Sequence, residues 1–219
     1  MSPNVRGKTG AIALVVASLA CAGISGPAAG QARKLGAYAG TIEASHAHRT
    51  LTYRARARVT MPVSERKPER IGAEFLAGEA PPATIRLTQW DYFHRAKSAD
   101  SSGTFVETKC WLAAPVEVPA MAMGVVNVDL RKKNYSLSIS LTSTQEIAFD
   151  CSSTRQKAFK KRQAFGLAVG TGAPGMQSES PQPLKDPARL AARFTMDPSK
   201  QSGGQAGPVV QEWDLKLSP

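Results

Sequence analysis

Three arginines alternate with apolar or small residues between Leu51 and Pro62. Arg54, Arg56 and Arg58 occupy every second position of this run. Successive side chains of a strand point to opposite faces, so the pattern predicts a strand with guanidinium groups about 7 Å apart on its solvent face. Guanidinium groups bind carboxylate, sulfate and phosphate groups in a bidentate manner. The run is therefore a candidate anion-binding site. In the alternative, the charges protect an edge strand from pairing with other chains.

A second basic cluster comprises Lys157, Lys160, Lys161 and Arg162. Such a cluster could lie on an anionic membrane surface or on an acidic glycan. Ser153 and Gln156 have the spacing of a capping box, which predicts a short basic helix ending near Gly166. A solvated basic loop is the alternative.

Three histidines, His46, His48 and His94, are the smallest set that could hold a catalytic zinc ion. The chain has no HExxH motif and no further histidine, which favours exposed histidines near strand ends, so we expect no metal and no cofactor. A Ser-His-Asp hydrolase site is recognised by geometry, and its test is whether a histidine meets a serine or an aspartate in a pocket. The stretch 170–175 (GTGAPG) lacks the Lys-Ser/Thr of a phosphate loop and is interpreted as a turn.

The N-terminus has the three parts of a secretory signal peptide. Arg6 and Lys8 precede an apolar run at 11–22, and small residues follow, with cleavage expected after Gly30 or Ala32. Residues 1–30 are thus predicted to be a signal peptide, and the mature protein is expected to be periplasmic or secreted.

Cysteines give a further prediction. Leu19-Ala20-Cys21 resembles the end of a bacterial lipoprotein box, although Ser18 replaces the usual aliphatic residue, so lipid anchoring through Cys21 is an alternative. If Cys21 leaves with the signal peptide, Cys110 and Cys151 remain in an oxidising compartment. We expect them to form a disulfide between neighbouring strands or packed sheets, with two separate buried thiols as the alternative.

The chain is basic, with a formal net charge of +11 that becomes +9 without Arg6 and Lys8. In an exported protein this charge favours an anionic surface, an acidic glycan or an acidic protein as the partner, rather than nucleic acid. A basic protein without any specific partner is the alternative. No apolar run after residue 32 has the length of a membrane span, so no transmembrane segment is expected in the mature chain.

Period-two patterns recur along the whole mature chain and predict about ten strands. They lie at 35–44, 50–61, 71–76, 83–93, 104–112, 121–130, 135–142, 147–151, 165–169, 190–196 and 209–217. For 190–196 a helix is the alternative, because Asp186-Pro187 is a good helix start and Leu190 and Phe194 are four apart. In the segment 83–93, Ile85 and Leu87 are predicted on one face and Trp90 and Tyr92 on the other. The pattern indicates an all-β antiparallel sandwich or open barrel. One domain is expected at 33–219, with a possible division near 97–103.

The function that these patterns favour is an exported, non-enzymatic, envelope-associated binding domain for an anionic ligand, a glycan or a protein partner. A secreted hydrolase with a site built from loops is one alternative. The outline, a basic all-β chain of this size, also resembles the pilus-assembly periplasmic chaperones. That resemblance implies a second alternative, a protein that donates a strand to its partner.

Overall fold

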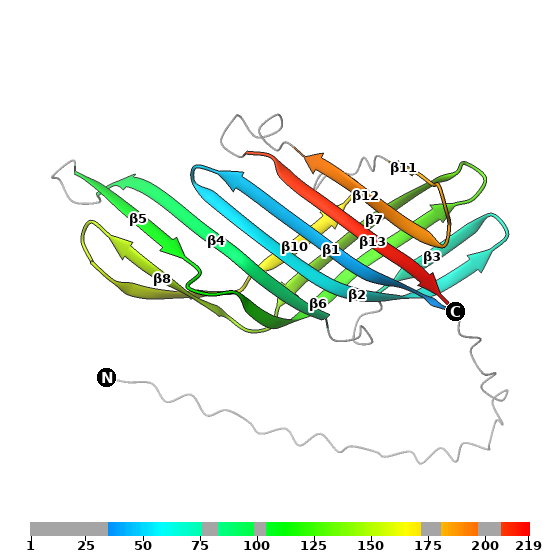
Figure 1. Cartoon of the computed structure of the whole chain (residues 1–219), viewed down its shortest axis with the longest axis horizontal. Helices are drawn as coiled ribbons and strands as arrows, with labels where there is room; N and C mark the ends of the chain where they lie inside the picture. The colour runs from blue at the N-terminus through cyan, green and yellow to red at the C-terminus, as the bar shows by residue number, and fades with distance from the viewer. Residues whose placement is uncertain (1–34, 76–82, 99–103, 172–180, 197–206) are drawn as a thin grey trace, which may run out of the picture. The chain divides into compact units, whose positions relative to one another are not determined.

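Alternating apolar and polar residues form strands throughout the part of the chain that the structure describes. The computed structural model describes residues 35–75, 83–98, 104–171, 181–196 and 207–219, and in these ranges it contains thirteen strands and no helix (Figure 1). The all-β antiparallel class predicted from the sequence is confirmed. The strands are β1 Ala37–His48, β2 Leu51–Lys67, β3 Arg70–Glu74, β4 Ala83–Lys97, β5 Phe105–Trp111, β6 Val116–Asp129, β7 Asn134–Ser143, β8 Ile147–Ser153, β9 Phe159–Gln163, β10 Gly166–Gly170, β11 Gln182–Pro183, β12 Arg189–Met196 and β13 Val209–Ser218.

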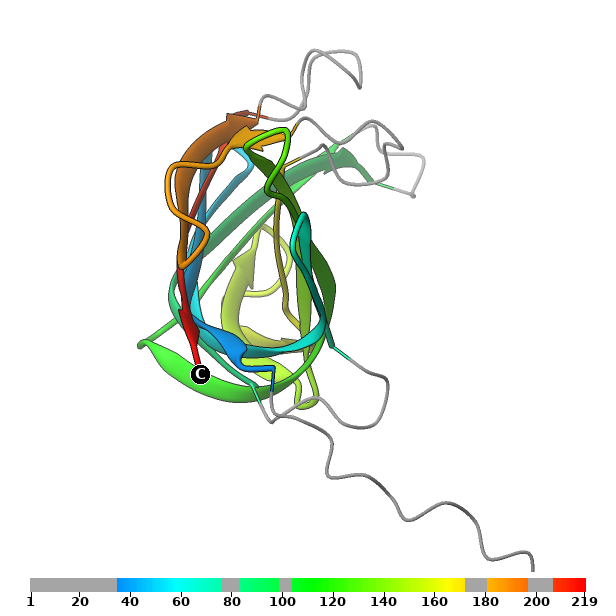
Figure 2. The same cartoon turned by 90° about the vertical axis from the view of Figure 1, so that its right-hand side faces the viewer.

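Hydrogen bonding joins these strands into one sheet that folds over into two layers, which Figure 2 shows facing each other. The first layer has the order β12-β13-β1-β2-β4-β5-β8-β9, and the second contains β3, β6 and β7, with β10 and β11 both paired to β7. The layers are continuous because β2 pairs with β4 through Leu51–Arg58 and with β3 through Val63–Lys67. Strand β6 likewise pairs with β4, β3 and β7.

The apolar faces of the two layers enclose the core, and two hydrogen bonds tie the layers together within it. Trp213 Nε1 on β13 donates to the hydroxyl of Tyr135 on β7, at 3.0 Å. The backbone N–H of Gly170 on β10 donates to Gln211 Oε1 on β13, at 2.8 Å. Buried polar groups are costly unless they are paired, so these bonds favour one relative placement of the layers.

A β-bulge in β4 changes which side chains share a face. Leu87 pairs with Ala55 while Gln89 pairs with Arg54, so Thr88 is the extra residue. Ile85, Leu87 and Trp90 are consequently all buried. The prediction that Trp90 lies on the opposite face from Leu87 is wrong, because strict alternation fails at a bulge.

The predicted basic helix at 153–166 is also wrong, and so is the basic loop. Ser153 and Gln156 do interact, but their bonds close a hairpin: Ser153 Oγ accepts from the N–H of Gln156 at 3.0 Å, and Ser153 N–H donates to the carbonyl of Gln156 at 2.7 Å. The chain then returns as β9, where Phe159 pairs with Cys151 and packs against the core. Pairing with β8 therefore overrides the local capping signal.

The C-terminal part of the chain follows the sequence patterns closely. The alternation at 190–196 forms the strand β12, and the alternation at 209–217 forms β13, which is paired on both sides, with β1 and β12. Contacts group Lys34–Pro219 into one compact unit. The predicted signal peptide at 1–30, Cys21 and most of the possible boundary at 97–103 lie outside the described residues, so those expectations stay predictions. Within the described ranges no helix is long and apolar enough to cross a membrane.

The predicted disulfide is confirmed between Cys110 on β5 and Cys151 on β8. The two residues face each other directly across the neighbouring strands, with Cα atoms 4.0 Å apart and an S–S distance of 2.06 Å. Both cysteines are buried. The bond therefore clamps β5 to β8 near the end of the first layer.

Replacing both cysteines by alanine should lower the free energy of unfolding by roughly 3 to 4 kcal/mol, because the bond closes a long loop in the unfolded chain. Denaturant titration of the two proteins measures the difference. Dithiothreitol should destabilise the wild type and leave the double-alanine variant unchanged. Equal unfolding midpoints for the wild type and the variant would show that the bond does not stabilise the fold.

Candidate anion-binding face

The predicted arginine face lies on the outer, solvent-exposed surface of the first layer. Arg54, Arg56 and Arg58 are exposed, while Ala55 and Ala57 between them are buried. Strand β2 is paired on both sides over this stretch, with β1 and with β4. It is therefore not an edge strand, and protection of an edge does not explain its arginines.

Pairing with β4 places a fourth arginine in the group. Arg56 lies directly opposite Arg86, and Arg58 lies opposite Thr84. Together with Glu117 of β6, these side chains line an open groove of about 410 Å³, which we call the arginine groove. Like charges directly opposite each other in a sheet are destabilising, so a bound anion would relieve the repulsion between Arg56 and Arg86.

Ion pairs divide the four arginines into two kinds. Arg54 is satisfied within the protein, since its Nε donates to Glu43 Oε1 at 2.7 Å. Arg86 makes a long contact with Glu117, at 3.8 Å. Among the residues that the structure describes, Arg56 and Arg58 form no ion pair. Two guanidinium groups of the groove are therefore available to a ligand, and a third is weakly held.

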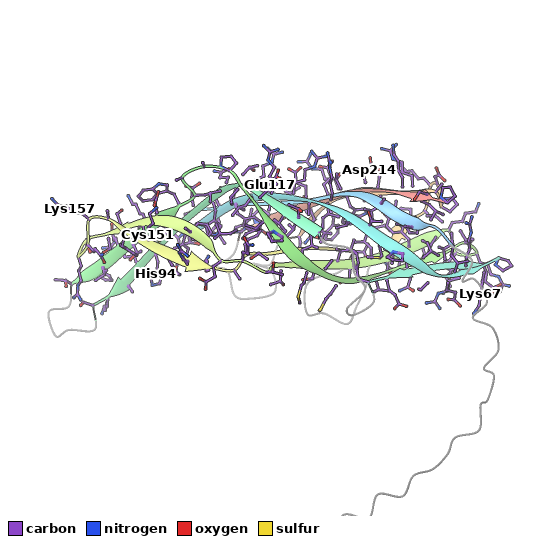
Figure 3. The ribbon with its side chains drawn as sticks, turned by 90° about the horizontal axis from the view of Figure 1, so that it is seen from below. Lys67, His94, Glu117, Cys151, Lys157 and Asp214 are labelled. Carbon is purple, nitrogen blue, oxygen red and sulfur yellow. A yellow bond between two sulfur atoms is a disulfide. The ribbon has the colours of Figure 1, made fainter. Side chains whose placement is uncertain are left out.

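One carboxylate elsewhere on the outer face is paired with an arginine outside the groove. Asp214, which shares this face because β1 places Thr41 between it and Arg58, accepts two hydrogen bonds from Arg189, at 2.8 and 2.9 Å. The hydrogen bond from Arg189 lowers the pKa of Asp214, burial opposes this with a smaller effect, and the charge of Arg189 lowers the pKa a little further. Figure 3 shows Asp214 at one surface of this layer and His94 at the other. The charge of Asp214 thus does not compete strongly for the groove.

The second predicted cluster is divided by β9. Lys160 pairs with Asp150, and Asp150 pairs with Trp111. Trp111 pairs with Asp91, and Asp91 with Thr52, which lies on the arginine-bearing face of β2. Lys160 therefore lies on the outer face, as does Arg162 two residues further on. Lys161 lies on the inner face, where its Nζ is 5.9 Å from the ring of Tyr92. Lys157 is exposed in the turn before β9.

Because of this division, the second cluster is a weaker candidate for a binding site than the arginine groove. Lys160 is also paired, at 3.7 Å from Asp150 Oδ1. The four basic residues at 157–162 do not form one patch. Sequence proximity suggested a cluster, whereas the period of a strand separates neighbouring side chains.

The rings of His46 and His48 lie 6.2 Å apart, but each of the three histidines has its own polar or stacking partner. His46 is buried and its Nδ1 donates to the carbonyl of Pro208 at 3.1 Å, while His48 Nδ1 lies 2.9 Å from Thr50 Oγ1. His94 is stacked on Tyr92, with ring centroids 6.1 Å apart. In the described ranges no three histidine, cysteine or acidic residues are grouped to hold a metal ion. His48 and Asp91 line one hollow of the surface, but no hydrogen bond in the described ranges joins a histidine to a serine or an aspartate.

Arg86 is the site residue that the sequence patterns missed. It stands in a predicted strand, but only the pairing of β4 with β2 brings it opposite Arg56. Comparison with protein-family models, curated proteins and solved structures finds no match for this chain.

Glu117 competes with a ligand for Arg86, so Glu117→Gln should raise the affinity of the groove for phosphate about two- to fivefold, as expected for an exposed ion pair. A phosphate titration followed by the NMR shifts of the arginine Nε–H groups measures this affinity. Glu69→Gln is the matched control. Glu69 lies in the β2–β3 turn and pairs with Arg131, so the charge change is the same but lies outside the groove. An equal gain in both variants would indicate an effect of net charge alone.

Proposed function

We propose that this chain is an exported, non-enzymatic binding protein that recognises an anionic ligand through Arg56, Arg58 and Arg86. The observation that carries the proposal is the arginine groove, in which two arginines face each other across paired strands and two guanidinium groups lack an ion pair among the described residues. Guanidinium forks suit the planar or tetrahedral oxygens of carboxylate, sulfate and phosphate groups. The net positive charge would attract such a ligand over a longer range.

Export is supported by two independent features. The first thirty residues have the composition of a signal peptide. The Cys110–Cys151 bond fits an oxidising compartment such as the periplasm or the extracellular space. A binding protein of the cell envelope or its surroundings would meet anionic lipids and acidic glycans there.

Charge reversal tests the groove. The double variant Arg56→Glu and Arg58→Glu should bind a dextran sulfate resin at least thirtyfold more weakly than the wild type, because it removes two charge-assisted contacts and adds two repulsive ones. Lys133→Glu with Lys185→Glu is the control, since both lysines are exposed and the charge change is the same. Binding constants at several salt concentrations measure both effects.

Two further variants separate the effect of the guanidinium groups from the effect of charge. Arg56→Lys with Arg58→Lys keeps the charge and removes the guanidinium forks, so it should bind more weakly than the wild type at equal salt. Lys160→Glu with Arg162→Glu should behave like the control. Losses that depend only on the total charge would mean a basic protein without a site. A wild type that binds neither dextran sulfate nor phosphatidylglycerol vesicles would overturn the proposal.

Export makes its own prediction. When the full chain is expressed in a bacterium, the protein recovered from the periplasm should begin after Gly30 or Ala32, as the signal peptidase requires small residues before the cleavage site. Mass spectrometry of the intact protein measures the N-terminus. An uncleaved chain that stays in the cytoplasm would contradict export while leaving the arginine groove to be judged separately.

A further inference from the structure

A second hollow lies on the same strands as the arginine groove. It has a volume of about 260 Å³, and its lining includes Thr52, Asp91, Phe93, Lys109 and Trp111. We call it the Trp111 pocket. Trp111 is 39% exposed, an unusual position for a large aromatic side chain with polar neighbours. The pocket is smaller than the sites of drug-sized molecules and suits a single ring.

Strand pairing places the Trp111 pocket and the arginine groove on one face. Thr52, Arg54, Arg56 and Arg58 alternate along one face of β2. Thr52 pairs with Asp91, and Asp91 pairs with Trp111, so these side chains share that face as well. From Thr52 in the pocket to Arg56 in the groove is four residues along β2, about 13 Å at the usual strand rise. Arg54 lies between them.

The Trp111 pocket differs in chemistry from the groove. Asp91 lines it together with Arg49 and Lys109, and Asp150 lies opposite Trp111 in the same row, so the pocket carries charges of both signs instead of arginines alone. Gln89 donates to Asp91 Oδ2 at 3.1 Å, and Oδ1 accepts no hydrogen bond from the described residues. The pocket therefore offers an apolar ring surface beside a free hydrogen-bond acceptor. A sugar ring, with apolar C–H faces and hydroxyl donors at its edge, has the matching chemistry.

We propose that the ligand of the outer face is an acidic polysaccharide. Its sulfate or carboxylate groups bind Arg56, Arg58 and Arg86, and one of its sugar rings packs on Trp111 with a hydroxyl donating to Asp91. This assignment rests on the proposed function and narrows its ligand class. A membrane of phosphatidylglycerol fits less well, because its glycerol headgroup carries hydroxyls but no ring to pack on Trp111.

Tryptophan fluorescence gives a direct test. The protein has three tryptophans, and Trp90 and Trp213 are only 6% and 1% exposed, so Trp111 dominates quenching by acrylamide. Heparin-derived oligosaccharides should protect the wild type from acrylamide once they are long enough to span both hollows. Inorganic sulfate and phosphatidylglycerol vesicles should give no such protection.

Variants of Trp111 provide the second arm. Trp111→Ala should weaken binding of the long oligosaccharide about 3- to 10-fold, the range expected for one aromatic packing contact. Trp111→Phe keeps a ring and should retain most of the affinity. Met121→Ala is the matched control, because Met121 is 64% exposed on β6 and lines neither hollow. The acrylamide experiment on the wild type stands even if Trp111→Ala does not fold.

The outcomes separate this inference from the proposed function. If oligosaccharides bind through the arginines but leave Trp111 quenchable, and Trp111→Ala binds as the wild type does, the assignment to a polysaccharide is overturned and the anion site remains. Binding of anionic vesicles without binding of oligosaccharides overturns the assignment in the same way. Binding of neither probe overturns both proposals.

Discussion

The position of β2 between β1 and β4 is the constraint on which the other features of the molecule depend. Its inward residues Ala55 and Ala57 are small and buried, and its outward arginines face solvent from the middle of a layer. The same strand continues beyond Arg58 to pair with β3 and so joins the two layers. A strand in this position cannot shift its register by one residue without burying guanidinium groups, which would be very costly. The arginine face and the fold are thus fixed together.

The alternation of apolar and polar residues predicted most strands of the first layer, but it could not predict which strands pair with each other. The alternation at 50–61 correctly gave β2 and its arginine face, and the cysteine count gave the bond between β5 and β8. Which strands lie beside β2 is set by contacts far apart in the sequence, so the place of Arg86 opposite Arg56 could not be read from the pattern. The predicted helix at 153–166 failed for a related reason: a capping box and a tight turn use the same serine hydroxyl.

The bulge at Thr88 shows how a single extra residue sets the layout of the outer face. Without it, strict alternation would put Asp91 on the opposite face of β4 from Arg86, because their numbers differ by five, which is odd. In the folded strand Gln89 pairs with Arg54 and Asp91 with Thr52, so both return to the arginine-bearing face. The bulge therefore aligns the Trp111 pocket with the arginine groove along β2 and β4. Bulges often re-aim side chains in this way.

The disulfide connects this layout to rigidity. The pair Cys110 and Cys151 is next to the pair Trp111 and Asp150 along β5 and β8. Neighbouring residues of a strand face opposite sides, so the cysteines lie on the inner face and Trp111 on the outer face. On the inner side, Tyr92 stacks between Trp90 and His94, and Trp90 packs on Phe149 with ring centroids 4.1 Å apart. The disulfide and the aromatic rings hold β4, β5 and β8 together on the inner face of the layer. The outer side chains, such as Trp111, remain exposed to solvent. A surface held in this way loses little conformational entropy when it binds, so modest contacts at Trp111 and the arginines can add up to useful affinity.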